Sequence, residues 1–179
     1  MLSQAPLNAV DVFVYFTTPR PTQEWLTTLP LIGHHTSPNP GYQQGAMQAM
    51  HDASIVPVVK GYDWIVRLNP DVLLLDFKPI YHLMQDPDAD AILGSCLQWS
   101  KQVMTDFTVL RRHVFTSVLK QPRRNSNAEL DMTACLARTL GTGFKRTKWI
   151  YYGNGECRTT LKGQVMHQHD PMYALDPRP

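Results

Sequence analysis

The pattern of apolar and polar positions divides the chain into segments that alternate between strand-like and helix-like spacing. Dense runs of β-branched and aromatic residues predict strands, and apolar residues that recur every three or four positions predict helices. Strands are expected over residues 10–16, 64–68, 72–75, 91–93, 105–110, 147–152 and 164–169, with a short extended piece over 29–32. Helices are expected over residues 23–28, 41–55, 78–84, 112–120 and 128–140.

This alternation predicts a single α/β domain over residues 1–179, with its core in residues 8–170 and a polar tail over 171–179. We expect a mostly parallel central sheet flanked by helices, because the connection from Phe16 to Trp64 is long enough for a crossover. The last two predicted strands are expected to form a small mixed β addition near the C-terminus.

The strand over 64–68 ends at the polar step on which the candidate chemistry depends. Its residues are apolar except for Arg67, which predicts a strand buried on both faces. Pro70 ends the strand, because proline has no N–H to donate to a neighbouring strand. Asp71 therefore lies just beyond a central strand, where open α/β sheets bind ligands. Asp71 is held between this strand and a second apolar run at 72–75, so its carboxylate needs a partner. A metal ion is the natural partner.

A helix start near residue 128 supplies further acids. Ser126 and Glu129 match the capping box S-x-x-E, and Gly141 and Gly143 are expected to stop the helix over 128–140. Glu129 therefore has a structural interpretation, which is slightly favoured, beside a chemical one.

A second helix start follows a polar segment. Residues 34–41 contain two prolines and two histidines and are expected to form a loop at the ligand-binding edge. His34 and His35 would have separate roles there, because adjacent residues of an extended chain point apart. Gln44 and Gly45 lie in the first turn of the next helix, whose free N–H groups could meet a phosphate. An ordinary helix start is the favoured interpretation.

Composition excludes several classes of protein. Of the 179 residues, 43% are hydrophobic and 18% are charged, which is typical of a globular chain and not of a disordered one. A net charge of +2 with scattered basic residues gives no electrostatic case for nucleic acid. No stretch approaches the roughly 20 apolar residues that span a bilayer, and no signal peptide is expected. We expect a soluble chain whose compartment is open: cytoplasmic, or Golgi or endoplasmic reticulum within a longer parent.

Two other groups of residues give no signal of a metal site. Three cysteines, at 96, 135 and 157, have no CxxC spacing, so neither a disulfide framework nor a cysteine-based zinc site is expected, while a single disulfide is left open. The acids at 86, 88 and 90 do not fit an EF-hand loop, and a solvated turn is the favoured interpretation.

Five segments resemble a known family in their order: DVFVYF, GYQQGAMQAM, YDWIVRLNPDVLL, TDFTVLRR and a helix that opens with an acid. This order is similar to that of GT-A-type glycosyltransferases, and most closely to their nucleotide-diphospho-sugar-transferase-like domains. The resemblance covers roughly residues 8–170 and implies a GT-A-like, Rossmann-like sheet. The family begins with an earlier strand, and only nine residues precede the strand at 10–16 here. The first strand is therefore expected to be lacking.

The resemblance implies a metal site. In this family an Asp-x-Asp element follows a core strand and holds Mn²⁺ or Mg²⁺ against the diphosphate of a nucleotide-sugar. Here the element is Asn69-Pro70-Asp71, so Asp71 is the implied ligand and Asn69 offers only an uncharged carbonyl oxygen. The family often adds a C-terminal histidine, and His167 and His169 would face the same side of a strand. Histidines of an edge strand, exposed to water, are an equal alternative.

The resemblance also implies a catalytic base near a helix start. Glu129 and Asp131 are the candidates, and two residues so spaced on a helix cannot both face one cleft. Asp106 resembles the family position that contacts the donor or acceptor sugar. Arg67 could reach a phosphate of the donor, and a buried ion pair with Asp63 or Asp76 is an equal alternative.

The expected function is metal-assisted transfer of a sugar from a nucleotide-diphospho-sugar to an acceptor glycan or another hydroxyl. The alternative is a truncated or degenerate, non-catalytic GT-A relative that binds a glycan or a protein partner, as Asn69 and the short N-terminus suggest. A third interpretation, a metal-dependent phosphoesterase, would use Asp71 with His167 and His169 but needs a second bridging acid.

Overall fold

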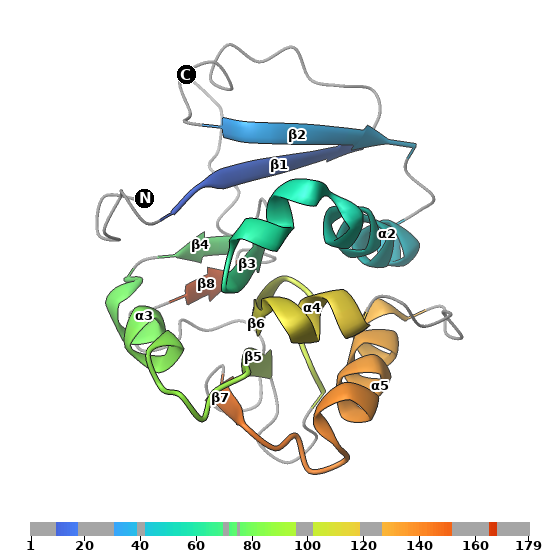
Figure 1. The fold of residues 1–179 in the computed structure, drawn as a ribbon. Helices are drawn as coiled ribbons and strands as arrows, with labels where there is room; N and C mark the ends of the chain where they lie inside the picture. The colour runs from blue at the N-terminus through green and yellow to red at the C-terminus, as the bar shows by residue number, and fades with distance from the viewer. Residues whose placement is uncertain are drawn as a thin grey trace, which may run out of the picture.

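The computed structural model describes residues 10–17, 31–38, 42–69, 72–74, 76–95, 102–118, 127–151 and 165–167 (Figure 1). The strands are β1 (Val12–Thr17), β2 (Leu31–Ser37), β3 (Trp64–Leu68), β4 (Val72–Leu74), β5 (Ala91–Ser95), β6 (Phe107–Arg111), β7 (Thr147–Tyr151) and β8 (Val165–His167). The helices are α2 (Tyr42–Ile55), the 3₁₀ helix η2 (Pro57–Gly61), α3 (Lys78–Met84), α4 (Arg112–Val118) and α5 (Ala128–Leu140). The α/β class is confirmed, because helices flank the sheets on both sides.

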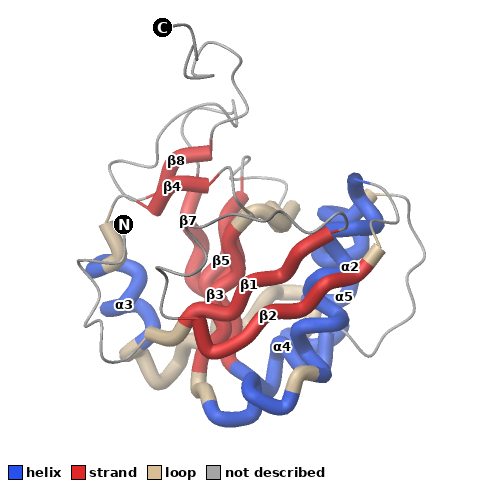
Figure 2. Tube along the Cα trace, turned by 90° about the horizontal axis from the view of Figure 1, so that it is seen from above, coloured by secondary structure: helices blue, strands red, loops and turns tan. Residues whose placement is uncertain are grey.

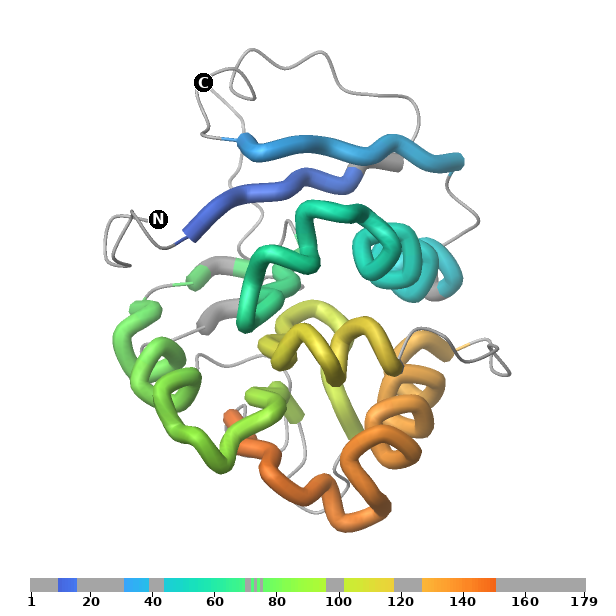
Figure 3. Tube along the Cα trace, in the orientation of Figure 1, coloured from blue at the N-terminus to red at the C-terminus, as the bar shows by residue number. Residues whose placement is uncertain are grey.

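A four-stranded sheet in the order β3-β6-β5-β7 forms the centre of the molecule. Strand β6 runs antiparallel to both β3 and β5, whereas β5 and β7 are parallel. Figure 3 shows β5 and β7 side by side although they are far apart in the chain. Strands β3, β5 and β7 therefore run in one direction, and β6 is the reversed strand of this sheet. The connection between β5 and β6, residues 96–106, is shorter than the dozen or more residues that a parallel crossover requires.

Alternate residues of the central strands enter two apolar cores. Leu93 and Leu110 belong to a core formed with α2, α4 and α5. Ile92 and Val109, their neighbours in sequence, belong to a core on the other face, with α3. All four side chains are fully buried. Side chains of a strand point alternately to opposite faces, so a sheet covered on both faces requires the near-continuous apolar runs seen in β5 and β6.

Two further strand pairs lie outside the central sheet. Strands β1 and β2 are parallel, and α2 packs against β1 as well as against α4 and α5. Strands β4 and β8 are antiparallel, with Val72 opposite His167. In Figure 2 the β4–β8 pair lies on the side of the molecule opposite α4. The expected C-terminal β addition is thus β8 paired with β4, while β7 belongs to the central sheet.

Strand β2 corrects the expectation of a loop over residues 34–41. His34 and His35 pair with Val14 and Tyr15 of β1, and exposure alternates along the whole of β2. The local signals, two prolines and several polar residues, favoured a loop, but pairing with β1 overrides them. The helix predicted over 23–28 lies outside the described residues.

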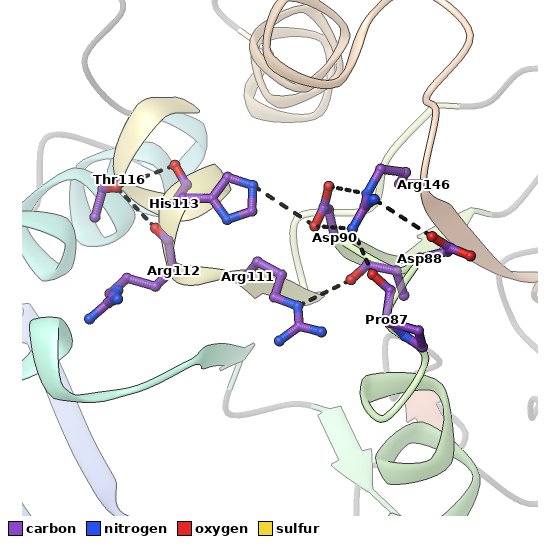
Figure 4. A network of polar contacts seen from close by, with 9 residues as sticks. Pro87, Asp88, Asp90, Arg111, Arg112, His113, Thr116 and Arg146 are labelled. Atoms are coloured by element: carbon purple, nitrogen blue, oxygen red, sulfur yellow. Dashed lines mark hydrogen bonds and ion pairs between the residues drawn. The ribbon is translucent and has the colours of Figure 1, made fainter.

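Ionic contacts join the start of β5 to the start of β7 (Figure 4). The Arg146 guanidinium binds the Asp90 carboxylate at 2.7 Å, and the Arg146 main-chain oxygen accepts from the Asp90 amide at 2.7 Å. Lys148 binds Asp86 at 2.6 Å. The prediction of a solvated acidic turn holds for Asp88, whose side chain is 83% exposed, and is wrong for Asp90, whose side chain is 14% exposed.

Candidate functional site

The carboxyl end of β3 meets the segment that leads into β6. The main-chain amide of Asn69 donates to the main-chain oxygen of Asp106 at 2.9 Å, which extends the β3–β6 pairing by one step. The amide of Val72 donates to the Asn69 oxygen at 3.1 Å and turns the chain toward β4. These two hydrogen bonds fix Asn69 between the end of one strand and the start of another.

Three polar side chains are connected at this point. Nη2 of Arg67 donates to Oδ1 of Asn69 at 2.7 Å. Nδ2 of Asn69 donates in turn to Oδ1 of Asp106. Arg67 is half-buried, and Asp106 is 8% exposed. The arginine that was expected to meet a phosphate or a neighbouring acid therefore binds the first residue of the Asn69-Pro70-Asp71 element.

Helix α5 brings Glu129 near the Asp106 carboxylate. The helix is capped by Asn127, whose side-chain oxygen accepts from the Leu130 amide at 2.9 Å. The predicted capping box is therefore wrong by one residue, because Asn127 takes the position assigned to Ser126, which lies outside the described residues. Glu129 is consequently not the partner of a cap. Its Oε2 accepts instead from Nε2 of Gln102 at 2.6 Å.

The surroundings of Glu129 favour its protonated form. Burial raises the pKa of Glu129 above its ordinary value, the hydrogen bond from Gln102 opposes that rise, and the charge of Asp106 adds to it. A half-buried carboxyl group with a raised pKa is a candidate for proton transfer in a reaction. Asp106 and Glu129 thus form a pair of carboxylates of unequal environment.

Threonine 133 fixes the segment that carries Gln102. Its Oγ1 accepts from the Val103 amide at 3.0 Å and donates to the Glu129 main-chain oxygen at 2.6 Å. The amide of Met104 donates to the Gly94 oxygen at 2.9 Å. The segment is therefore held between the end of β5 and the first turn of α5. Sequence reasoning missed Gln102, since no periodic pattern or motif marks it.

Asp131 occupies a different environment from Glu129. It is 5% exposed and lies one helical turn before Cys135, whose thiol pKa is raised by burial first and by the charge of Asp131 in smaller part. Two residues so spaced on a helix point to different faces, so Glu129 and Asp131 are expected to lie in different surroundings. Glu129 lies near enough to Asp106 for the charge of Asp106 to raise its pKa.

The structure describes the remaining predicted site residues only in part. Gln44 is exposed and Gly45 half-buried, both in the first turn of α2. Asp71, His169 and the side chain of His167 lie outside the described part of the chain. The β4–β8 register does place the His167 backbone opposite Val72, the residue that follows Asp71. Within the described residues, no three His, Cys, Asp or Glu side chains are grouped as a metal site.

A second polar cluster, the Asp52 cluster, joins α2 to the β1–β2 pair. Asp52 accepts from Tyr15 at 2.8 Å and from Gln48 at 2.6 Å, and it lies 3.3 Å from His51 and 3.8 Å from His35. The Tyr15 and His35 rings stack with their centroids 5.5 Å apart. Burial acts to raise the pKa of Asp52, but the three hydrogen bonds and the charge of His35 together lower it.

Replacing Asp52 by asparagine is expected to reduce stability in a pH-dependent way. A lowered folded pKa means that the carboxylate stabilises the fold fully above the unfolded value near 3.9 and loses this effect as pH falls through the folded value. We expect Asp52→Asn to lower the free energy of unfolding by about 1–2 kcal/mol at pH 7 and by less below pH ~4. Urea unfolding at both pH values measures the difference. A penalty that does not shrink in acid would contradict this account.

The helices in the described ranges are all too short or too polar to cross a bilayer.

Comparisons with solved structures give several structural likenesses, of which two are described here. No family model and no curated protein matches the chain. One similar structure is a glycosyltransferase involved in the glycosylation of the major capsid of PBCV-1, at 12% identity and a TM-score of 0.49, covering 90% of this chain and 96% of that one. Another is A197 from STIV, at 14% identity and a TM-score of 0.43, covering 90% and 95%. Both TM-scores lie below 0.5, so we take no function from either structure.

Proposed function

We propose that the chain transfers a sugar from a nucleotide-diphospho-sugar to a hydroxyl group of an acceptor glycan or another molecule. The observation that carries the proposal is Glu129, a half-buried acid that accepts from Gln102 and whose pKa is raised by burial and by the charge of Asp106. Asp106 in turn accepts from Asn69, where β3 ends and where the sequence resembles the donor-binding element of GT-A-type glycosyltransferases.

In the proposed reaction Glu129 is the general base. The acceptor hydroxyl gives its proton to the Glu129 carboxylate while its oxygen bonds to the anomeric carbon of the donor sugar. The bond from that carbon to the diphosphate oxygen breaks, and the nucleoside diphosphate leaves with the electron pair. The Gln102 side chain keeps one oxygen of Glu129 in place, which leaves the other carboxylate oxygen to meet the acceptor.

A divalent cation is part of the proposal. Asp71, with His167 or His169, would hold Mn²⁺ or Mg²⁺, and carboxylate and imidazole are ligands that such ions accept. The pairing of β4 with β8 is consistent with this set, because it brings the segment after Asp71 against His167. When bound, the cation would neutralise the charge that develops on the leaving diphosphate. Arg67 is engaged with Asn69 and is not assigned to the phosphates here.

The test combines binding with turnover. Calorimetry of UDP and GDP with Mn²⁺ is expected to show binding that EDTA abolishes, and a panel of nucleotide-sugars is expected to include one that releases nucleoside diphosphate slowly in water. If neither nucleotide binds and no donor is cleaved, the transferase proposal fails. Binding to a glycan array in that case would establish the non-catalytic binding module instead.

A further inference from the structure

Both the oxygen and the NH₂ group of the Asn69 side-chain amide form hydrogen bonds. Its oxygen accepts from the Arg67 guanidinium at 2.7 Å, and its NH₂ group donates to the Asp106 carboxylate. An amide can accept from a cation and donate to an anion at the same time, whereas a carboxylate has no proton to donate. Asparagine is thus chemically suited to a position between an arginine and an aspartate. An aspartate there would face Asp106 with a like charge.

The Asn69 side chain orients Asp106 beyond what the backbone achieves. The main-chain hydrogen bond from Asn69 to Asp106, at 2.9 Å, holds the backbones together whatever side chain stands at 69. The Asp106 carboxylate is attached through rotatable bonds, so its direction depends on side-chain partners. Asp106 is 8% exposed, and in such surroundings a charge-assisted hydrogen bond is stronger than in water.

We propose that Asn69 is a positioning residue, whose amide, anchored by Arg67, holds the Asp106 carboxylate beside Glu129. The inference deepens the proposed function, because Glu129 is the proposed base. It also means that Asn69 is not expected to be a ligand of the proposed metal ion. The amide oxygen that a cation would need already accepts from a guanidinium, whose positive charge opposes a second cation at the same atom.

The position of the Asp106 carboxylate affects the pKa of Glu129 through its negative charge. After burial, the nearby Asp106 is the group that raises the pKa of Glu129. Removing the Asp106 charge, or letting the carboxylate swing away, should therefore make Glu129 titrate at lower pH. Asn69 does not contact the reacting atoms, so its effect on Glu129 passes through Asp106.

The test follows the titration of Glu129 and needs no substrate. The chain has three glutamates, at 24, 129 and 156, so protein labelled with ¹³C at glutamate carboxyl groups gives three signals, and Glu129→Gln assigns the relevant one. Asp106→Asn and Asn69→Ala are each expected to move the Glu129 titration to lower pH. Asp63→Asn is the control, because Asp63 is an exposed acid at the opposite end of β3 and should leave that titration in place.

A double variant that exchanges the two residues tests the proposal in a protein that is expected to stay folded. Asn69→Asp combined with Asp106→Asn keeps one amide–carboxylate hydrogen bond and gives Arg67 a carboxylate partner, but moves the negative charge away from Glu129. This variant should unfold within a few degrees of the wild type and still show the lowered Glu129 titration. A folded Asp106→Asn, Asn69→Ala or swapped variant whose Glu129 titrates as in the wild type overturns the proposal. If the titrations shift as expected while no nucleotide-sugar is ever cleaved, Asn69 keeps its positioning role and the proposed transferase activity is what fails.

Discussion

Replacing Glu129 with glutamine is expected to lower the rate of sugar transfer by about 10²–10⁴-fold, the usual contribution of a general base. Glutamine keeps the size of the side chain and can still bond to Gln102, but it cannot take the acceptor proton. The loss should fall on kcat, with KM for the donor little changed. Release of nucleoside diphosphate in the presence of donor and acceptor measures both parameters.

The matched control for Glu129→Gln is Asp88→Asn, which removes one acid from the exposed turn before β5. It should transfer sugar at the wild-type rate. The pH profile supplies a second check. Because the pKa of Glu129 is raised, kcat in the wild type should fall as pH drops through that raised value, and this limb should disappear in Glu129→Gln. A variant that keeps wild-type kcat would remove Glu129 from the chemistry.

Replacing Asp71 with alanine is expected to remove the effect of Mn²⁺ on nucleotide binding. If Asp71 supplies the charged ligand, UDP or GDP should bind the variant with Mn²⁺ no better than the wild type binds it in EDTA. The expected loss of affinity in Mn²⁺ is at least about tenfold, since even outer-shell partners of metal ligands contribute 10–100-fold. Calorimetry with and without EDTA measures it. An undiminished Mn²⁺ effect in Asp71→Ala would show that other residues hold the ion.

The sequence was most informative where local pattern and tertiary structure agree. The apolar run Trp64–Leu68 forms β3 over the predicted range, and the helix over 128–140 begins and ends where the prediction placed it. The prediction that this strand is central and buried on both faces is wrong, because β3 lies at the edge of the sheet and Val66 and Leu68 are exposed. Local signals failed where a distant partner decides the outcome. Strand β2 exists because its backbone pairs with β1, and nothing within residues 31–37 announces that partner.

The candidate site shows the same division. Arg67, Asn69, Asp106 and Glu129 could be named from the sequence, because they stand at strand ends or a helix start. Their mutual contacts could not, since they depend on β6 lying antiparallel beside β3. The shift of the cap from Ser126 to Asn127 changes the role of Glu129 completely, yet both residues are good caps by type.

The position of β6 has a consequence for how the molecule is assembled. Strand β6 lies between β3 and β5, although both precede it in the chain, so the centre of the sheet stays open until residues 107–111 have been synthesised and inserted. Insertion of this one buried strand brings Asp106 to Asn69, and α5 must then dock to add Glu129. A growing chain released before residue 107 would leave the hydrogen-bonding edges of β3 and β5 that face β6 unpaired. Late closure of this kind makes the chain prone to association during synthesis, and it means that the proposed base meets its partners only when the fold is complete.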